Sequence, residues 1–200
     1  YQLAAALGEL GVWVRLHYVY PYPHVDNIIP LMAQGKVLPY LDIPFQHASP
    51  TILRKMRRPG QVEKTLERIK SWREQMPSLT IRSTFIVGFP GETADDFQDT
   101  VRLVEKCDYD ALYIFKYSQR RDTPAAKLAD DVSDEQKKQR FLELEARHRA
   151  LQQGIYTGYI GREVSVLVEG ESTRSPRDMS GHSSCHKVVN FHGNASQPGD

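Results

Sequence analysis

The sequence predicts an α/β fold in which part of a (βα) barrel, or an open parallel sheet, is followed by a small all-β unit. Segments rich in β-branched and aromatic residues alternate with segments of helical apolar spacing over most of the chain. Strands that alternate with helices pair in parallel through crossover connections. After Gly158 and Gly161 the apolar residues alternate one by one, as in a half-buried strand. A length of 200 residues is sufficient for one domain with a small appendage.

Each element is predicted from local signals. Capping residues define three helix starts: Ser49 before Pro50, Thr93, and Ser133 with Gln136 in the capping-box position. The expected helices are 3–10, 25–32, 50–56, 62–69, 94–104 and 134–155. The expected strands are 12–20, 40–45, 80–87, 111–117, 163–168 and 187–191. The first four strands make half a barrel, so we expect a barrel part over 1–157 and a β unit over 158–200. The chain is expected to begin inside a domain and to stop before the β unit is complete.

Composition excludes several classes of protein. Lysine and arginine total 26 against 25 for aspartate and glutamate, so the net charge of +1 creates no whole-molecule attraction for nucleic acid. Any RNA contact must therefore come from a local patch. The sequence has no long apolar run and no signal-peptide pattern at its start, which predicts a cytoplasmic protein without a membrane partner. Cys107 and Cys185 alone cannot form a disulfide framework or a four-cysteine metal site.

Candidate site residues lie where the predicted parallel strands end, because ligands gather at that edge of α/β folds. Gly88 and Gly91 allow a close approach of the backbone to a ligand near a helix N-terminus, or they merely make a tight turn. Gln46 and His47 could bind a ligand by hydrogen bonds, and His47 could transfer a proton. The ordinary interpretation of this pair is a loop satisfied by backbone groups.

Two other groups also have a functional and an ordinary interpretation. The first combines imidazoles and a thiol of the kind that bind zinc: His182, Cys185, His186 and His192. Their spacing contains no paired C-x-x-C element, so we favour scattered loop residues and assign no metal ligand. The second is a basic run near a helix end: Arg54, Lys55, Arg57 and Arg58. It could contact RNA phosphates or an acidic protein, although such a run is more often a solvated face.

Several motifs resemble a known family, the radical S-adenosylmethionine (SAM) methylthiotransferases. The segments that resemble the RimO-type enzymes are RLHYVYP (15–21), LDIPFQHAS (41–49), MRRPG (56–60) and RSTFIVGFPGET (82–93). The segments that resemble the sister MiaB-type enzymes are FKYS (115–118), TPAA (123–126), LVEG (167–170) and 180–191. The last of these resembles the beginning of a TRAM domain. The resemblance thus implies the C-terminal half of a radical SAM partial (βα) barrel, followed by a truncated TRAM-like domain.

The resemblance also implies an activity. Such enzymes use SAM and 4Fe-4S clusters to generate a 5′-deoxyadenosyl radical before a methylthio group is inserted. RimO-type enzymes modify an aspartate of a small-subunit ribosomal protein, which is the leading hypothesis because the first-half resemblance is longer. MiaB-type enzymes modify an isopentenylated adenosine in tRNA, which is the alternative. A third hypothesis is a non-catalytic remnant that binds RNA or the ribosome.

Carried over by position, six residues fall near the SAM site of the family: Gln46, His47, Ser83, Gly88, Gly91 and Glu92. The three-cysteine motif of the family lies upstream of Tyr1, so no residue of this chain is expected to bind the cluster, and this part alone is expected to be inactive. Residues 182–186 depart from the arginine-threonine and asparagine pattern usual in the tRNA-modifying members. The catalytic residues and the oligomeric state stay unassigned.

Overall fold

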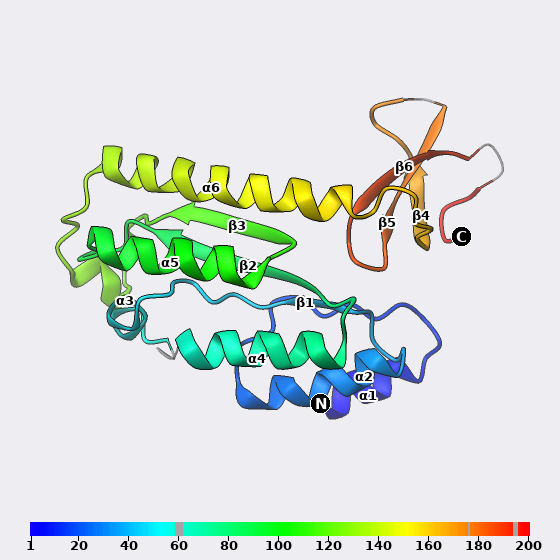
Figure 1. Cartoon of the computed structure of the whole chain (residues 1–200), viewed down its shortest axis with the longest axis horizontal. Coiled ribbons are helices and arrows are strands. Elements are labelled where there is room, and N and C mark those ends of the chain that lie inside the picture. The colour runs from blue at the N-terminus through cyan, green and yellow to red at the C-terminus, as the bar shows by residue number, and fades with distance from the viewer. Residues whose placement is uncertain (59–61, 176, 194–195) are drawn as a thin grey trace.

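The computed structural model describes residues 1–58, 62–175, 177–193 and 196–200. Within these ranges the strands form two separate sheets (Figure 1). The first sheet is parallel, with strand order β1-β2-β3: Tyr40–Asp42, Thr80–Val87 and Ala111–Lys116. The second is antiparallel, with strand order β4-β5-β6: Val166–Glu171, Asp178–Ser183 and Val188–His192. We call the first sheet with its helices the half-barrel, and the second sheet the β module.

Helices precede and follow the strands of the parallel sheet along the chain. They are α1 (Gln2–Gly8), η1 (Pro23–Ile28), α2 (Ile29–Ala33), α3 (Pro50–Lys55), α4 (Val62–Gln75), α5 (Ala94–Cys107), η2 (Pro124–Lys127) and α6 (Asp134–Thr157). In Figure 1, α4, α5 and α6 lie along the same face of the sheet, and α6 leads into the β module. No helix among the described residues is long and apolar enough to cross a membrane.

The two faces of the parallel sheet differ because neighbouring side chains of a strand point to opposite sides. Ile81, Phe85 and Val87 of β2 are fully buried in the core that the helices cover. On β3 the alternate residues Tyr113 and Phe115 are 45% and 55% exposed. We call the side of the sheet that carries Tyr113 and Phe115 the open face.

The local capping predictions are confirmed. Ser49 precedes α3 and its hydroxyl accepts a hydrogen bond from the amide of Ile52, with Pro50 at the first helical position. Thr93 and Asp96 form a capping box on α5, and Ser133 and Gln136 form one on α6. These hydrogen bonds satisfy amides that would otherwise lack a partner at the start of a helix.

One predicted strand is wrong, and one strand of the structure was not predicted. Residues 12–20 run beside β1 but form only one isolated bridge, between Leu16 and Leu41, and Tyr18 has a φ of 54° that interrupts a regular ladder. Conversely, β5 lies in the centre of the β module although its sequence DMSGHS has little intrinsic preference for strand. In both places the pairing partner, and not the local sequence, decides the conformation. The resemblance segment at 56–60 reaches residues 59 and 60, which lie outside the described residues.

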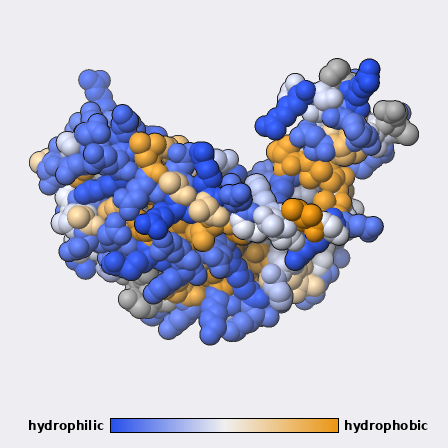
Figure 2. All heavy atoms as spheres, turned by 45° about the horizontal axis from the view of Figure 1, so that its top comes forward, coloured by the Kyte–Doolittle hydropathy of each residue, from blue (hydrophilic) through white to orange (hydrophobic). Residues whose placement is uncertain are grey.

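The β module docks on the half-barrel at the end where the parallel strands begin. The ammonium of Lys187 lies 3.0 Å from the carboxylate of Asp110, directly before β3. The guanidinium of Arg15 donates to the carbonyl oxygen of Ser183 at 2.9 Å. Figure 2 shows the two parts as separate lobes, with hydrophobic side chains gathered on the smaller lobe near the junction. Specific polar contacts thus connect the β module to the half-barrel.

Candidate functional site

The loop after β1 places Gln46 at the carboxyl edge of the sheet. Its amide donates to the carbonyl oxygen of Thr84 and its carbonyl accepts from the amide of Ile86, both at 2.8 Å, so the backbone is fixed to β2. Gln46 nevertheless has a φ of 71°, a left-handed conformation that costs a non-glycine residue about 1–3 kcal/mol. Among the described residues the Gln46 side-chain amide has no hydrogen-bond partner. A half-buried amide with both a donor and an acceptor is therefore available to a ligand here.

The glycine turn after β2 is closed by carboxylates of the chain itself. Oε2 of Glu92 accepts from the amides of Gly88 and Phe89, and Oδ1 of Asp131 accepts from the amide of Gly91 at 2.6 Å. Three backbone amides of this turn therefore already have hydrogen-bond partners within the chain. Gly88 and Gly91 have φ values of 73° and 76°, which favour glycine.

The same glycines are required by packing. A Cβ at Gly88 would overlap the aliphatic chain of Lys137 from α6. A Cβ at Gly91 would overlap the ammonium of Lys55 from α3, which also contacts the carbonyl oxygen of Pro90. The close approach that the sequence predicted is therefore made, at least in part, by side chains of the protein.

His47, Ser83 and Glu92 are buried and face other parts of the chain. Nδ1 of His47 accepts from the amide of Ser49 at 2.9 Å, and its Nε2 lies 3.7 Å from Oε1 of Glu92. The hydroxyl of Ser83 accepts from the amide of Phe45 at 3.3 Å, on the side of β2 that the helices cover. The structure thus brings His47 and Glu92 together next to the glycine turn, whereas Ser83 supports the loop before Gln46.

An ion pair that the sequence analysis missed lies on the other side of the sheet. Nη2 of Arg82 is 2.5 Å from Oδ2 of Asp42, and both side chains are buried. The guanidinium also lies 4.6 Å from the ring centre of Tyr113 on the open face. Arg82 and Thr84 alternate with the apolar core residues of β2, and this two-residue period was the available signal.

The structure separates the members of the basic run at 54–58 and of the histidine and cysteine group at 182–192. Arg54 and Lys55 lie in the last turn of α3, and Arg58 stacks on the ring of Tyr20 at 4.9 Å. The rings of His182 and His186 stack at 4.6 Å, but His192 pairs with Asp178 instead. In the described ranges no three His, Cys, Asp or Glu side chains are placed to hold a metal ion.

The two cysteines do not fit an iron–sulfur cluster. Cys107 is buried at the end of α5, and this burial raises its thiol pKa to about 11. Cys185 is buried in the β module, where its sulfur lies 3.1 Å from the hydroxyl of Ser183. A cluster needs three or four thiolates side by side, whereas Cys107 lies in the half-barrel and Cys185 in the β module.

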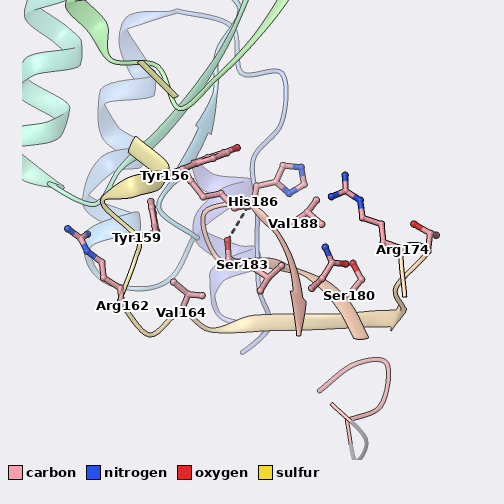
Figure 3. A pocket seen from close by; sticks show the side chains of 13 residues that line it. Tyr156, Tyr159, Arg162, Val164, Arg174, Ser180, Ser183, His186 and Val188 are labelled. Atoms are coloured by element: carbon pink, nitrogen blue, oxygen red, sulfur yellow. Dashed lines mark hydrogen bonds between the residues drawn. The ribbon is translucent and has the colours of Figure 1, made fainter. Parts of the chain in front are cut away.

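A second candidate site is a hollow of about 670 Å³ between the end of α6 and the β module (Figure 3). Tyr156 lines it from the end of α6 and Tyr159 from the turn that follows, and Arg162 and Arg174 lie at its opposite ends. The Lys187 ammonium lies 4.8 Å from the Tyr159 ring. The described residues that line the hollow include these three cations and no Asp or Glu. Lys187 is paired with Asp110, so Arg162 and Arg174 are the cations that no carboxylate of this lining opposes. Cations beside aromatic rings suit a planar anionic group.

Comparison with known proteins identifies the superfamily of the chain. A model of the radical SAM superfamily matches residues 1–104, just over half of the chain. This chain belongs to the radical SAM superfamily. A solved structure with this kind of fold, the radical SAM enzyme coproporphyrinogen III oxidase (HemN) from Escherichia coli, superposes with a TM-score of 0.62 at 15% identity. The superposition covers 90% of this chain and 48% of that one. The fold is therefore part of a radical SAM barrel followed by a small antiparallel sheet.

Two curated relatives of this radical SAM chain are closer in sequence. One is the ribosomal protein uS12 methylthiotransferase RimO of Cellvibrio japonicus, 64% identical over 173 residues and covering 84% of this chain. The other is the RimO of Bordetella petrii, 52% identical over 206 aligned positions and covering the whole chain. The chain spans 38% and 46% of the length of these two relatives. The RimO resemblance predicted for the first half thus extends, in the Bordetella relative, to the second half.

Proposed function

We propose that this chain is part of a methylthiotransferase that inserts a methylthio group into an aspartate of ribosomal protein uS12. The observation that carries the proposal is an identity of 52–64% to proteins named uS12 methylthiotransferase RimO. The chain would supply the carboxyl-edge loops of the barrel and the β module. We further propose a cytoplasmic location, where the ribosomal substrate is made, and a domain division between residues 157 and 158.

The proposed cofactors are SAM and 4Fe-4S clusters. SAM, cleaved at a cluster, supplies the radical chemistry, and the cluster ligands would come from outside this chain because its two cysteines do not fit one. Among the six residues near the SAM site by resemblance, Gln46 has the free side-chain amide that a cofactor contact requires. Gly88 and Gly91 shape the adjoining turn, while the buried His47, Ser83 and Glu92 act by holding the two loops in place.

The test uses the full-length protein with its upstream region, reconstituted anaerobically with iron and sulfide. Cleavage of SAM to 5′-deoxyadenosine and addition of a methylthio group to uS12, detected by mass spectrometry, are the expected results. A well-folded, cluster-loaded protein that cleaves no SAM would overturn the proposal.

The hollow in the β module favours a second candidate, methylthiolation of tRNA or another RNA-linked role. Its tyrosines, with Arg162 and Arg174, match the stacking and phosphate contacts of single-stranded RNA. Full-length protein would be assayed for binding to an anticodon stem-loop and to uS12 at 50 and 200 mM salt. RNA binding that weakens steeply with salt and is lost in R162Q/R174Q supports the RNA candidate. Binding of uS12 alone, unaffected by these changes, favours the first proposal.

A further inference from the structure

Two buried polar atoms without a hydrogen-bond partner face each other at the carboxyl edge of the sheet. They are Nε2 of His47 and Oε1 of Glu92, separated by 3.7 Å, and both side chains are completely buried. A third group, the guanidinium of Arg140 from α6, lies 3.5 Å from the same Oε1 atom and is 13% exposed. These three residues come from the loop after β1, the turn after β2, and α6.

The hydrogen bonds of His47 determine where its proton lies. Nδ1 accepts from the backbone amide of Ser49, so this nitrogen carries a lone pair. The proton of a neutral imidazole must then sit on Nε2. Nε2 points to Glu92, so His47 directs a donor at the carboxylate from the Gln46 loop.

Glu92 connects that donor to the glycine turn. Its Oε2 accepts from the amides of Gly88 and Phe89, while Oε1 faces His47 and Arg140. A buried carboxylate is stable only when its charge is balanced and its lone pairs are satisfied. Arg140 provides the balancing charge, and its Nη1 also donates to the backbone carbonyl of Glu92 at 3.1 Å.

We propose that Arg140 is a positioning residue for SAM binding, and this inference rests on the proposed function. Arg140 holds the carboxylate of Glu92, Glu92 fixes the start of the turn at 88–91 through the amides of Gly88 and Phe89, and His47 faces the same carboxylate from the loop that carries Gln46. Loss of the guanidinium leaves a buried carboxylate without its balancing charge, so Glu92 rotates away and releases the turn amides. Arg140 acts through Glu92 and does not touch the cofactor.

The experiment measures the dissociation constant of SAM for the full-length, cluster-loaded protein by anaerobic equilibrium dialysis. The variants are R140M, which removes the charge, and R140K, which keeps it. The matched control is R149M on the same helix, because Arg149 is 75% exposed in its side chain and forms a solvent-exposed pair with Glu145 at 3.0 Å. We expect a dissociation constant at least ten times higher for R140M, an unchanged value for R149M, and partial rescue by R140K.

Two further readouts separate positioning from general stability. KM for SAM should rise in R140M while the rate of SAM cleavage at saturating SAM stays within about twofold of the wild type. E92Q should weaken SAM binding to a similar degree, and the double variant R140M/E92Q should bind no worse than E92Q, because the two residues act in series. E92Q alone decides the matter if R140M does not fold, with normal SAM affinity as the contradicting result.

The outcomes distinguish this inference from the proposed function. If the wild-type protein binds SAM and R140M binds it as well as R149M does, the positioning role is wrong while the proposed function stands. If the loaded wild-type protein binds no SAM, the proposed function itself fails and the positioning role fails with it.

Discussion

Gly88 shows how one residue at the carboxyl edge is constrained from two directions. Its φ of 73° disfavours any residue with a Cβ, and the Lys137 side chain occupies the space where that Cβ would lie. Gly161 has a similar φ of 81° but nothing within 4 Å of its virtual Cβ. A substitution at Gly161 therefore measures backbone strain alone, whereas one at Gly88 measures backbone strain and a steric clash together.

We expect Gly88→Ala to lower the free energy of unfolding more than Gly161→Ala does. Gly161→Ala should cost about 1–2 kcal/mol from the left-handed backbone alone. Gly88→Ala adds the displacement of Lys137, an overpacking cost of about 1–3 kcal/mol. Urea denaturation of the full-length protein measures both, and equal losses would contradict the clash.

His186 is the second residue with a distinctive environment, at the junction of the two sheets. Burial is the largest cause that lowers the pKa of its imidazole, and together with the charges of Arg15, His182, His17 and Arg82 it brings this pKa to about 4. His186 is consequently neutral in the folded chain at neutral pH.

Because of His186, the free energy of unfolding should fall as the pH is lowered from about 6.5 toward 4. In that window the unfolded chain, with an ordinary histidine pKa of about 6.5, binds more protons than the folded one. We expect the melting temperature of His186→Gln to depend less on pH than that of the wild type. His24→Gln, which changes an exposed histidine, serves as the control and should keep the wild-type dependence.

At the scale of elements, α6 unites the two parts of the molecule. Its start is fixed by the Ser133 capping box and by Asp134 and Glu135 in the first turn, where acids complement the helix dipole. Near its other end Gly154 sits inside the helix with no atom within 4 Å of a virtual Cβ. The helical conformation is therefore stabilised at the start of α6 and is less stable near Gly154, where the helix approaches the β module.

Gly154→Ala should raise the free energy of unfolding by about 0.5–1 kcal/mol, because alanine loses less backbone entropy in a helix. Ser133→Ala should lower it by about 1 kcal/mol, because the cap to the Gln136 amide is lost. Both values follow from thermal and urea denaturation. A loss of stability in Gly154→Ala would mean that this end of α6 is not helical in solution.

At the scale of the whole molecule, the junction depends on a few charged contacts. Lys187 and Asp110 are 15% and 11% exposed in their side chains, and the other oxygen of Asp110 accepts from the amide of Ile81 at 3.0 Å. Asp110 thus contacts both β2 and the β module. Burial would lower the pKa of Lys187, but the nearby Asp110 carboxylate raises it overall and keeps the ammonium charged.

Lys187→Met should loosen the β module while leaving the parallel sheet intact. The Asp110 carboxylate would lose its partner, at a cost of about 1–3 kcal/mol. Hydrogen exchange should therefore speed up in β4–β6 and stay unchanged in β2. Arg149→Met, which breaks an exposed pair, should change neither, and faster exchange in β2 would contradict separate docking.

The sequence by itself determined the features that depend on neighbours along the chain. Alternating strands and helices were enough to predict the parallel α/β part, and the caps at Ser49, Thr93 and Ser133 were predicted correctly because a cap bonds to amides two or three residues away. The segments at 15–21, 41–49, 56–60 and 82–93 together predicted the family.

Only the tertiary structure decided the features that depend on distant partners. Arg140 and Glu92 are 48 residues apart, and α6 must pack on the sheet before the guanidinium reaches the turn. The same holds for Asp42 with Arg82, for the hollow beside Lys187, and for β5, whose conformation comes from the strands on both sides. Local propensity depends on residues that are close in sequence. Buried charges and central strands are stable only once distant segments surround them.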